Sequence, residues 1–155
     1  MMNRQTIEEA QASWGRGVVA IGKADNPQAA RDLAGEFIRA HYCLDGGELL
    51  FCPTKASVCQ FRSTFEDALS YFVGGDERHA EDSGFALQPW SAVRFENTGV
   101  VFMGDIAMAM GNYFFSQSDG SELKVEYSFV YTCTEAGQVK IHLHHSALVY
   151  GSNAG

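Results

Sequence analysis

Three histidines and a serine stand close together near the end of the chain, in the segment KIHLHHSALVYG at residues 140–151. Alternate side chains of a β-strand share a face, so an unbroken strand places His142, His144 and Ser146 on one side. The opposite side then carries the alternating residues Val139, Ile141, Leu143, His145 and Ala147. A neutral imidazole beside a hydroxyl can handle protons near neutral pH, and paired imidazoles can bind a metal ion.

The spacing alone leaves three interpretations of this segment. His142 and His144 could chelate a metal ion, or His144 and Ser146 could move a proton in a pocket. In the third interpretation, the commonest for an arbitrary sequence, these side chains are only hydrogen-bonded members of a structural strand. The metal interpretation is the weakest, because the remaining histidines, His41 and His79, show no pattern that would make either a third ligand.

Two further hydroxyl groups are candidates. Tyr71 lies in the last turn of a predicted helix, next to Phe72, where a tyrosine usually belongs to the core. In a functional role it would offer a neutral donor to a pocket. Thr54 follows Pro53 just before that helix, where Thr54 or Ser57 would ordinarily serve as the N-cap. Taken singly, both hydroxyls favour the structural interpretation.

Charged residues around these candidates have simpler explanations. Arg62 and Glu66 have the i,i+4 spacing of a helical ion pair. The segment DERHAEDSG, residues 76–84, is typical of an exposed acidic loop. Glu126 alternates with Tyr127 on a predicted strand and is expected to be solvated or at an interface, so it is left out of the predicted site.

The first half of the chain has the periodicity of helices. We expect helices over 4–23 and over 27–42, the second with Asn26 as N-cap and Pro27 at its first position. A short strand, ELLFCP, follows. A third helix is then predicted to end at Gly74-Gly75, with one apolar side formed by Val58, Phe61, Phe65, Ala68, Leu69 and Phe72.

The second half of the chain changes to a period of two, which indicates strands. They are predicted at 90–97, at 100–115 with a break at Gly104-Asp105 and a bend near Gly111, at 122–133 and at 138–150. Turns are predicted at NTG, SDGS and EAGQ. Helices followed by an antiparallel meander make an α+β fold, in which N-terminal helices pack in a strongly curved antiparallel sheet. The cone inside such a sheet is a natural small-molecule pocket, lined by aromatic residues of the core.

Composition limits the classes of partner. The chain has 155 residues, predicted as a single domain over 1–155, and a net charge of −8 without a basic cluster. Nucleic acids and membrane surfaces attract Lys and Arg, so neither is an expected partner. Four scattered cysteines suggest free thiols, and no leader-like or membrane-spanning segment stands out. We expect the cytoplasm, or an organelle interior if a presequence has been removed, and a homodimer formed by the outer sheet face.

Six segments, in order, make a more specific pattern: LLFCPTKA, FRSTFEDALSYFVGG, EDSGFALQPWS, AMGNYFF, KVEYSFVYT and IHLHHSALVYG. Together they resemble the iota-class carbonic anhydrases, a family related to the association domain of calmodulin-dependent protein kinase II. The resemblance runs over roughly residues 14–151. It implies the cystatin-like cone fold of nuclear transport factor 2 and the ketosteroid isomerases.

The resemblance also implies an activity, the reversible hydration of carbon dioxide to bicarbonate. By similarity, the polar groups around bicarbonate are those of Thr54, Tyr71, His144 and Ser146. Some members of the family work without a metal, and manganese or zinc is associated with others; for this chain we expect none. The sequence departs from the family at Ala147, where a second serine is usual, and at Val149, where proline is common.

These residues suit a metal-free mechanism. Zinc prepares hydroxide by lowering the pKa of its bound water, whereas a site without metal must remove the proton during attack on carbon. His144 is predicted to be the base, and the hydroxyls of Thr54, Tyr71 and Ser146 are predicted to hold the product oxygens. Two alternatives are a non-enzymatic oligomerisation module and a cone-fold isomerase or dehydratase. The isomerase or dehydratase would need a pocket Asp or Glu as base, and the matched segments offer no obvious one beyond Glu126.

Overall fold

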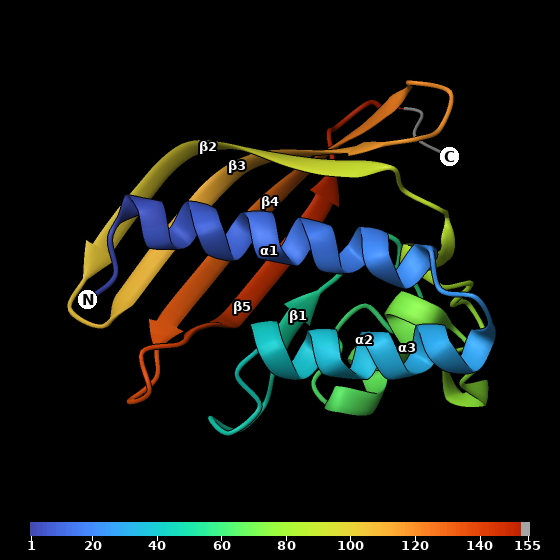
Figure 1. Ribbon diagram of the computed structural model, residues 1–155, viewed down its shortest axis with the longest axis horizontal. Helices are drawn as coiled ribbons and strands as arrows, with labels where there is room; N and C mark the ends of the chain where they lie inside the picture. The colour runs from blue at the N-terminus through green and yellow to red at the C-terminus, as the bar shows by residue number, and fades with distance from the viewer. Residues whose placement is uncertain (153–155) are drawn as a thin grey trace.

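Three helices cover one face of a curved, five-stranded sheet in the computed structural model, which describes residues 1–152. In Figure 1, helix α1 crosses in front of the strands, and α2 lies beside it with α3 behind. The helices are α1 (Arg4–Gly22), α2 (Pro27–His41) and α3 (Phe65–Val73). The strands are β1 (Leu50–Cys52), β2 (Ala92–Met103), β3 (Ile106–Ser116), β4 (Glu122–Cys133) and β5 (Val139–Leu148), and short 3₁₀ turns span Glu77–His79 and Phe85–Leu87.

The strands are arranged in the order β1-β5-β4-β3-β2. Strands β2 to β5 form the predicted antiparallel meander, and the short β1 joins its edge parallel to β5. This pairing sets Phe51 of β1 opposite His144 of β5. The α+β fold expected from the sequence is therefore confirmed. Because β1 pairs with β5, the loop that follows β1 lies at the edge of β5.

The first two helices begin where the sequence predicts. Asn26 caps α2 by accepting the Ala29 N–H at 2.8 Å, with Pro27 at the first helical position. The glycines of α1 do not end it, because they permit close packing. A Cβ on Gly17 would lie 2.4 Å from Cδ1 of Phe37, so α1 and α2 approach each other where only glycine fits.

The third helix is shorter than predicted. It begins at Phe65 with Thr64 as its N-cap, and neither Thr54 nor Ser57 caps it. Val58 and Phe61, predicted to lie on its apolar side, are instead exposed in the loop after β1. The periodicity was misleading because this loop is organised by a buried polar cluster, described below, and not by helical packing.

The predicted turn at NTG, residues 97–99, is also wrong. Strand β2 continues through it with a bulge between Asn97 and Gly99, and the chain turns at Gly104-Asp105. Asn97 looks like a turn residue, but its side chain exchanges two 2.8 Å hydrogen bonds with Gln11 of α1. A partly buried pair of side-chain amides thus keeps a typical turn residue within a strand.

The core lies between the helices and the concave face of the sheet. Trp14 of α1 stands at its centre, with the rings of Phe37, Tyr113 and His144 each within 5.8 Å, centroid to centroid. The aromatic residues buried in this core include Phe72, Phe85, Trp90, Phe115 and Phe129, whereas Phe114 lies on the other face under Arg94. The four cysteines are free thiols. Within residues 1–152, none of the helices has the length and apolar character required to cross a bilayer.

Candidate active site

A bulge at His142 decides which side chains of β5 face the core. Val130 of β4 pairs with Leu143, but the next residue, Tyr131, pairs with Ile141, so that His142 is the extra residue. Ile141 is buried on the inner face, contrary to the predicted alternation, and the His142 ring lies outside, beside Gly46. His142 and His144 therefore do not form the two-ligand edge on which the metal interpretation depended.

Beyond the bulge, the predicted alternation holds. His144 and Ser146 are buried on the concave side, with 2% and 4% of their surface exposed. His145 is exposed on the outer face, and Ala147 faces outward with it. The replacement of serine at position 147 therefore changes the outer face of the sheet and leaves the inner face unaltered.

The four hydroxyl and imidazole groups predicted from the sequence come together in one cavity. Thr54 reaches it from the loop after β1, Tyr71 from α3, and His144 and Ser146 from β5. Apolar surface closes the rest, supplied by Trp14, Phe51, Pro53, Phe72 and Phe85. The cavity measures about 10 Å³, which is room for about one water molecule. Larger hollows lie elsewhere, one of them on the outer sheet face beside Glu126 and His145.

A chain of hydrogen bonds crosses the floor of this cavity. The Thr54 hydroxyl lies 2.6 Å from the Ser146 hydroxyl, which is also bonded to the Tyr113 hydroxyl of β3. The Tyr113 oxygen lies 3.0 Å from Nε2 of His144. On the opposite wall, the Tyr71 hydroxyl accepts the Lys55 N–H at 3.2 Å. His144 is therefore joined to the cavity hydroxyls through Tyr113.

The His144 ring is fixed on both faces and at both nitrogens. It stacks between Phe129 and Phe51, with centroids 4.2 and 4.8 Å away. Its Nδ1 lies 3.0 Å from the Tyr42 hydroxyl, which accepts the Trp14 indole N–H at 3.1 Å. Trp14 and Tyr42 were not predicted as site residues, and nothing in the spacing of Tyr42, at the end of α2, points to that role.

Tyr113 was also missed, although the sequence carried a signal for it. It lies in AMGNYFF, one of the six segments behind the family resemblance, and alternates with the inward-facing Phe115. The sequence alone assigned no role to Tyr113. The structure shows it as the bridge between His144 and Ser146.

Burial keeps this group of side chains uncharged. Desolvation, with a smaller contribution from nearby His145, lowers the pKa of His144 to about 3. Desolvation also raises the pKa values of Tyr71 and Tyr113 well above that of a free tyrosine. At neutral pH the cavity therefore presents protonated hydroxyls and a neutral imidazole.

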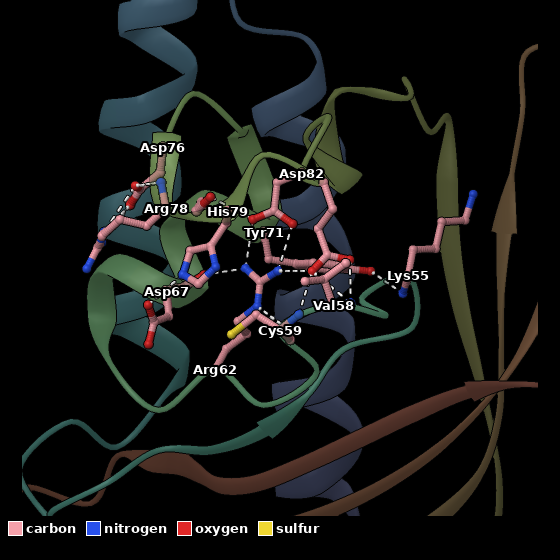
Figure 2. Close-up of polar contacts among 12 residues, drawn as sticks. Lys55, Val58, Cys59, Arg62, Asp67, Tyr71, Asp76, Arg78, His79 and Asp82 are labelled. Atoms are coloured by element: carbon pink, nitrogen blue, oxygen red, sulfur yellow. Dashed lines mark hydrogen bonds and ion pairs between the residues drawn. The ribbon is translucent and has the colours of Figure 1, made fainter.

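A buried ion pair organises the loops beside the cavity (Figure 2). The Arg62 guanidinium, wholly buried, donates to Asp82 at 2.7 and 2.8 Å, and Ser70 of α3 donates to the same carboxylate at 2.6 Å. The predicted Arg62–Glu66 pair is therefore wrong. The segment 76–84 is not simply an exposed loop either, because a buried guanidinium needs a carboxylate and Asp82 supplies it.

Glu81, next to Asp82, holds the loop that carries Thr54. Its carboxylate accepts the backbone N–H groups of Ser57, Val58 and Cys59 at 2.7, 3.2 and 2.7 Å. These backbone donors lower the pKa of Glu81 to about 2. Because Thr54 and Lys55 lie in the same loop, Glu81 and Arg62 together fix the wall of the cavity opposite β5.

The histidines outside β5, His41 and His79, form hydrogen bonds away from the cavity. The His79 Nε2 lies 2.7 Å from Asp67, and the His41 ring bonds the Ser13 hydroxyl at 3.0 Å. In the part of the chain that the structure describes, no three His, Cys, Asp or Glu side chains gather as a metal-binding group.

Comparisons with known proteins point to one family of enzymes. A family model described as metal-independent carbonic anhydrase matches residues 5–148. A metal-independent carbonic anhydrase from Nostoc sp. is 37% identical over 97% of this chain and 77% of its own length. A crystal structure of the iota-carbonic anhydrase from a cyanobacterium, complexed with bicarbonate, superposes with a TM-score of 0.93 at 34% identity, over 97% of this chain and 94% of the other.

More distant structures share the fold alone. One, from Xanthomonas campestris, is described as a calcium/calmodulin dependent protein kinase II association domain; it has a TM-score of 0.61 at 21% identity, covering 98% of this chain and 91% of its own. Another, described as a ketosteroid isomerase from Parabacteroides distasonis, has a TM-score of 0.56 at 19% identity, covering 97% and 96%. The predicted cone fold is confirmed by these neighbours.

Proposed function

The chain belongs to the metal-independent carbonic anhydrase family, and from this we propose that it hydrates carbon dioxide reversibly in the cavity lined by Thr54, Tyr71, His144 and Ser146. One observation carries the assignment of these residues. Groups from three separate segments, selected by resemblance to the family, line the same small cavity, and all of them except Tyr71 are joined in one hydrogen-bond network. We further propose that the whole chain serves as one catalytic domain.

The cavity combines what the reaction needs. Carbon dioxide is small and apolar, and the rings of Phe51, Phe72 and Phe85 offer it an apolar wall. Negative charge develops on its oxygens as water attacks, and the hydroxyls of Thr54 and Tyr71 are placed to donate hydrogen bonds to them. Carbon dioxide and water together need more room than about one water molecule, so the cavity must widen when they enter.

The neutral site suggests how the proton moves. The water oxygen forms a bond to carbon while one C=O π bond opens. The proton leaving the water passes to the Thr54 hydroxyl oxygen, and the proton of that hydroxyl passes to an oxygen of carbon dioxide. The product is carbonic acid, which ionises to bicarbonate and a proton on release. The base predicted from the sequence, His144, is a weak one at a pKa of about 3, and this relay does not need it to hold a proton.

The size and lining of the cavity favour this function over the enzymatic alternative. A cone-fold isomerase or dehydratase needs room for an organic molecule, which would require a much larger expansion of this cavity than carbon dioxide and one water molecule do. Its acidic base would have been Glu126, which is exposed on the outer face of the sheet. An oligomerisation module without activity needs no buried hydroxyl network at all.

We propose that the reaction needs no metal ion, in keeping with the description of the family. We also propose that the protein is a homodimer, formed by the outer face of the sheet. That face exposes Val101, Met103, Ile106 and Met110, all between 41% and 63% exposed. Apolar side chains gathered on one sheet face favour burial against a second copy. Placement in the cytoplasm or in an organelle interior stays a prediction.

The decisive experiment is a stopped-flow hydration assay on protein treated with a chelator and analysed for bound metals. We expect full activity without stoichiometric metal. Thr54→Val, which replaces the hydroxyl with a methyl group, should lower kcat by roughly 10²-fold or more. The exposed Thr98, on β2, provides the matched control, since Thr98→Val should leave the rate unchanged. Activity that disappears with the metal and returns with it would contradict the metal-free mechanism.

A further inference from the structure

We propose that Trp14 and Tyr42 hold His144 in the neutral tautomer with its hydrogen on Nε2, so that the ring donates toward the cavity instead of accepting a proton from it. Trp14 and Tyr42 are then positioning residues, which act on the reaction through His144. The tautomer follows from the hydrogen bonds alone, and its catalytic consequence rests on the proposed function.

Trp14 determines the direction of the first hydrogen bond in the network. An indole N–H can only donate, so the Tyr42 oxygen accepts at 3.1 Å. Tyr42 is 1% exposed, and its hydroxyl hydrogen would lose a hydrogen bond on burial unless it found an acceptor. Among the hydrogen bonds of the described residues, the acceptor available to it is Nδ1 of His144, at 3.0 Å. Tyr42 therefore donates to Nδ1, and Nδ1 carries no hydrogen.

The hydrogen bond from Tyr42 to Nδ1 determines which group donates in each of the remaining bonds of the network. A neutral imidazole with an acceptor at Nδ1 carries its hydrogen on Nε2, which donates to the Tyr113 oxygen at 3.0 Å. Tyr113 then donates to Ser146. Ser146 in turn donates to Thr54 at 2.6 Å. Every hydrogen in the chain points from α1 toward the cavity.

Two hydrogens remain at the end of this chain, and both belong to groups that line the cavity. The Thr54 oxygen accepts from Ser146, so its own hydrogen is available to a ligand. The Tyr71 oxygen accepts from the Lys55 N–H, which leaves its hydrogen available in the same way. The cavity is thus arranged as a set of donors, which suits oxygens that gain negative charge during hydration.

Packing prevents the His144 ring from rotating away from its hydrogen-bond partners. Phe129 and Phe51 cover the two faces of His144, so that turning the ring about its Cβ–Cγ bond, which would take Nδ1 and Nε2 away from their partners, requires both phenyl rings to move. The opposite tautomer would leave Tyr42 with a hydrogen and no acceptor, and would leave Nε2 facing Tyr113 as an acceptor. Two bonds would have to reverse at a buried site, and such reversals are costly where water cannot compensate.

The test is a nitrogen-15 NMR measurement on protein labelled at histidine, with the His144 signals assigned by their loss in His144→Gln. In the wild type we expect the shifts of a neutral ring protonated at Nε2, unchanged between pH 6 and 8. A ring protonated at Nδ1, or at both nitrogens in that range, would overturn the proposal. This spectrum decides the tautomer without any measurement of activity.

The role of Tyr42 is tested by Tyr42→Phe, which removes the hydroxyl that fixes Nδ1. We expect the His144 shifts to move toward a mixture of tautomers and kcat to fall on the order of tenfold, with KM little changed. Tyr131→Phe is the matched control, because Tyr131 is 2% exposed on β4 and makes no bond to His144. It should keep both the spectrum and the rate of the wild type.

The outcomes separate this inference from the proposed function. If Tyr42→Phe leaves the spectrum and kcat of the wild type, Tyr42 is not a positioning residue. If that variant does not fold, the wild-type spectrum still decides the tautomer. A wild type with the Nε2 tautomer but no hydration activity would support the assigned tautomer and overturn the proposed function.

Discussion

Arg62 and Asp82 form a two-pronged ion pair, with N–O distances of 2.7 and 2.8 Å, in which neither side chain is more than 1% exposed. The pair joins the loop after β1 to the segment that follows α3. It also lies close to the site, because the guanidinium carbon is 5.9 Å from the centre of the Tyr71 ring. Stability and activity should therefore depend on the same pair.

Asp82→Asn should destabilise the protein by about 3–5 kcal/mol, because it leaves a buried guanidinium without its countercharge. Urea denaturation followed by circular dichroism measures this loss. Asp76→Asn is the control, since Asp76 pairs with the exposed Arg78 at the surface and should matter little. An Asp82→Asn protein as stable as the wild type would show that water or another group replaces the carboxylate.

Glu81→Gln should loosen the loop that carries Thr54 while the fold survives. An amide oxygen is a weaker acceptor than a carboxylate for the three backbone N–H groups of residues 57–59. Hydrogen exchange at these amides should become faster, and kcat should fall by several-fold. Unchanged exchange there would mean that Glu81 does not hold the loop.

The sequence predicted the fold and four residues of the cavity, for identifiable reasons. Capping residues and changes of periodicity are local signals, and they located α2 and the meander. The family resemblance selected Thr54, Tyr71, His144 and Ser146 as a set, which spacing alone would have left as separate structural residues.

What the sequence could not predict depends on contacts between distant segments. Arg62 and Asp82 are 20 residues apart, so the nearer Glu66 was the natural partner to propose. The bulge at His142 follows from the register between β4 and β5, which no single strand specifies. Tyr42 bonds His144 across 102 positions of the sequence, and its role became visible only in three dimensions.

The outer sheet face should be the dimer interface. Met110→Glu places a charge in the middle of this apolar face, where Met110 is 61% exposed in the single chain. Light scattering after size exclusion should find a dimer for the wild type and a monomer for the variant, with the fold retained. A wild-type monomer at all concentrations would refute the proposed homodimer.

Burial of His144 should make the protein less stable in acid. The unfolded histidine binds a proton near pH 6.5, whereas folded His144, with its pKa lowered to about 3, does not until far lower pH. Unfolding therefore takes up a proton between these values, and the free energy of unfolding falls as the pH falls. Between pH 7 and 5, the stability advantage of the wild type over His144→Gln should shrink by roughly 2 kcal/mol. A constant difference would mean that His144 has the same pKa in the folded and unfolded states.

The hydration rate should be nearly independent of pH from 6 to 9. The titratable groups beside His144 are Tyr42, at the end of α2, and Tyr113 of β3, which both bond it, and His145, which follows it on β5. The other elements packed against the ring are α1, β1 and β4. They present Trp14, Phe51 and Phe129 to it, which do not titrate. Burial lowers the pKa of His144 below this range and raises those of Tyr42 and Tyr113 further above it.

Stopped-flow measurement of kcat/KM for hydration checks this expectation. If His144 were a base with an ordinary pKa near 6.5, the rate would rise as the pH increased through that value, because only the neutral ring accepts a proton. The neutral hydroxyl relay requires no such rise. A sigmoid centred between pH 6 and 7 in the wild type, but absent from the residual activity of His144→Gln, would restore His144 as the base and refute the relay through Thr54.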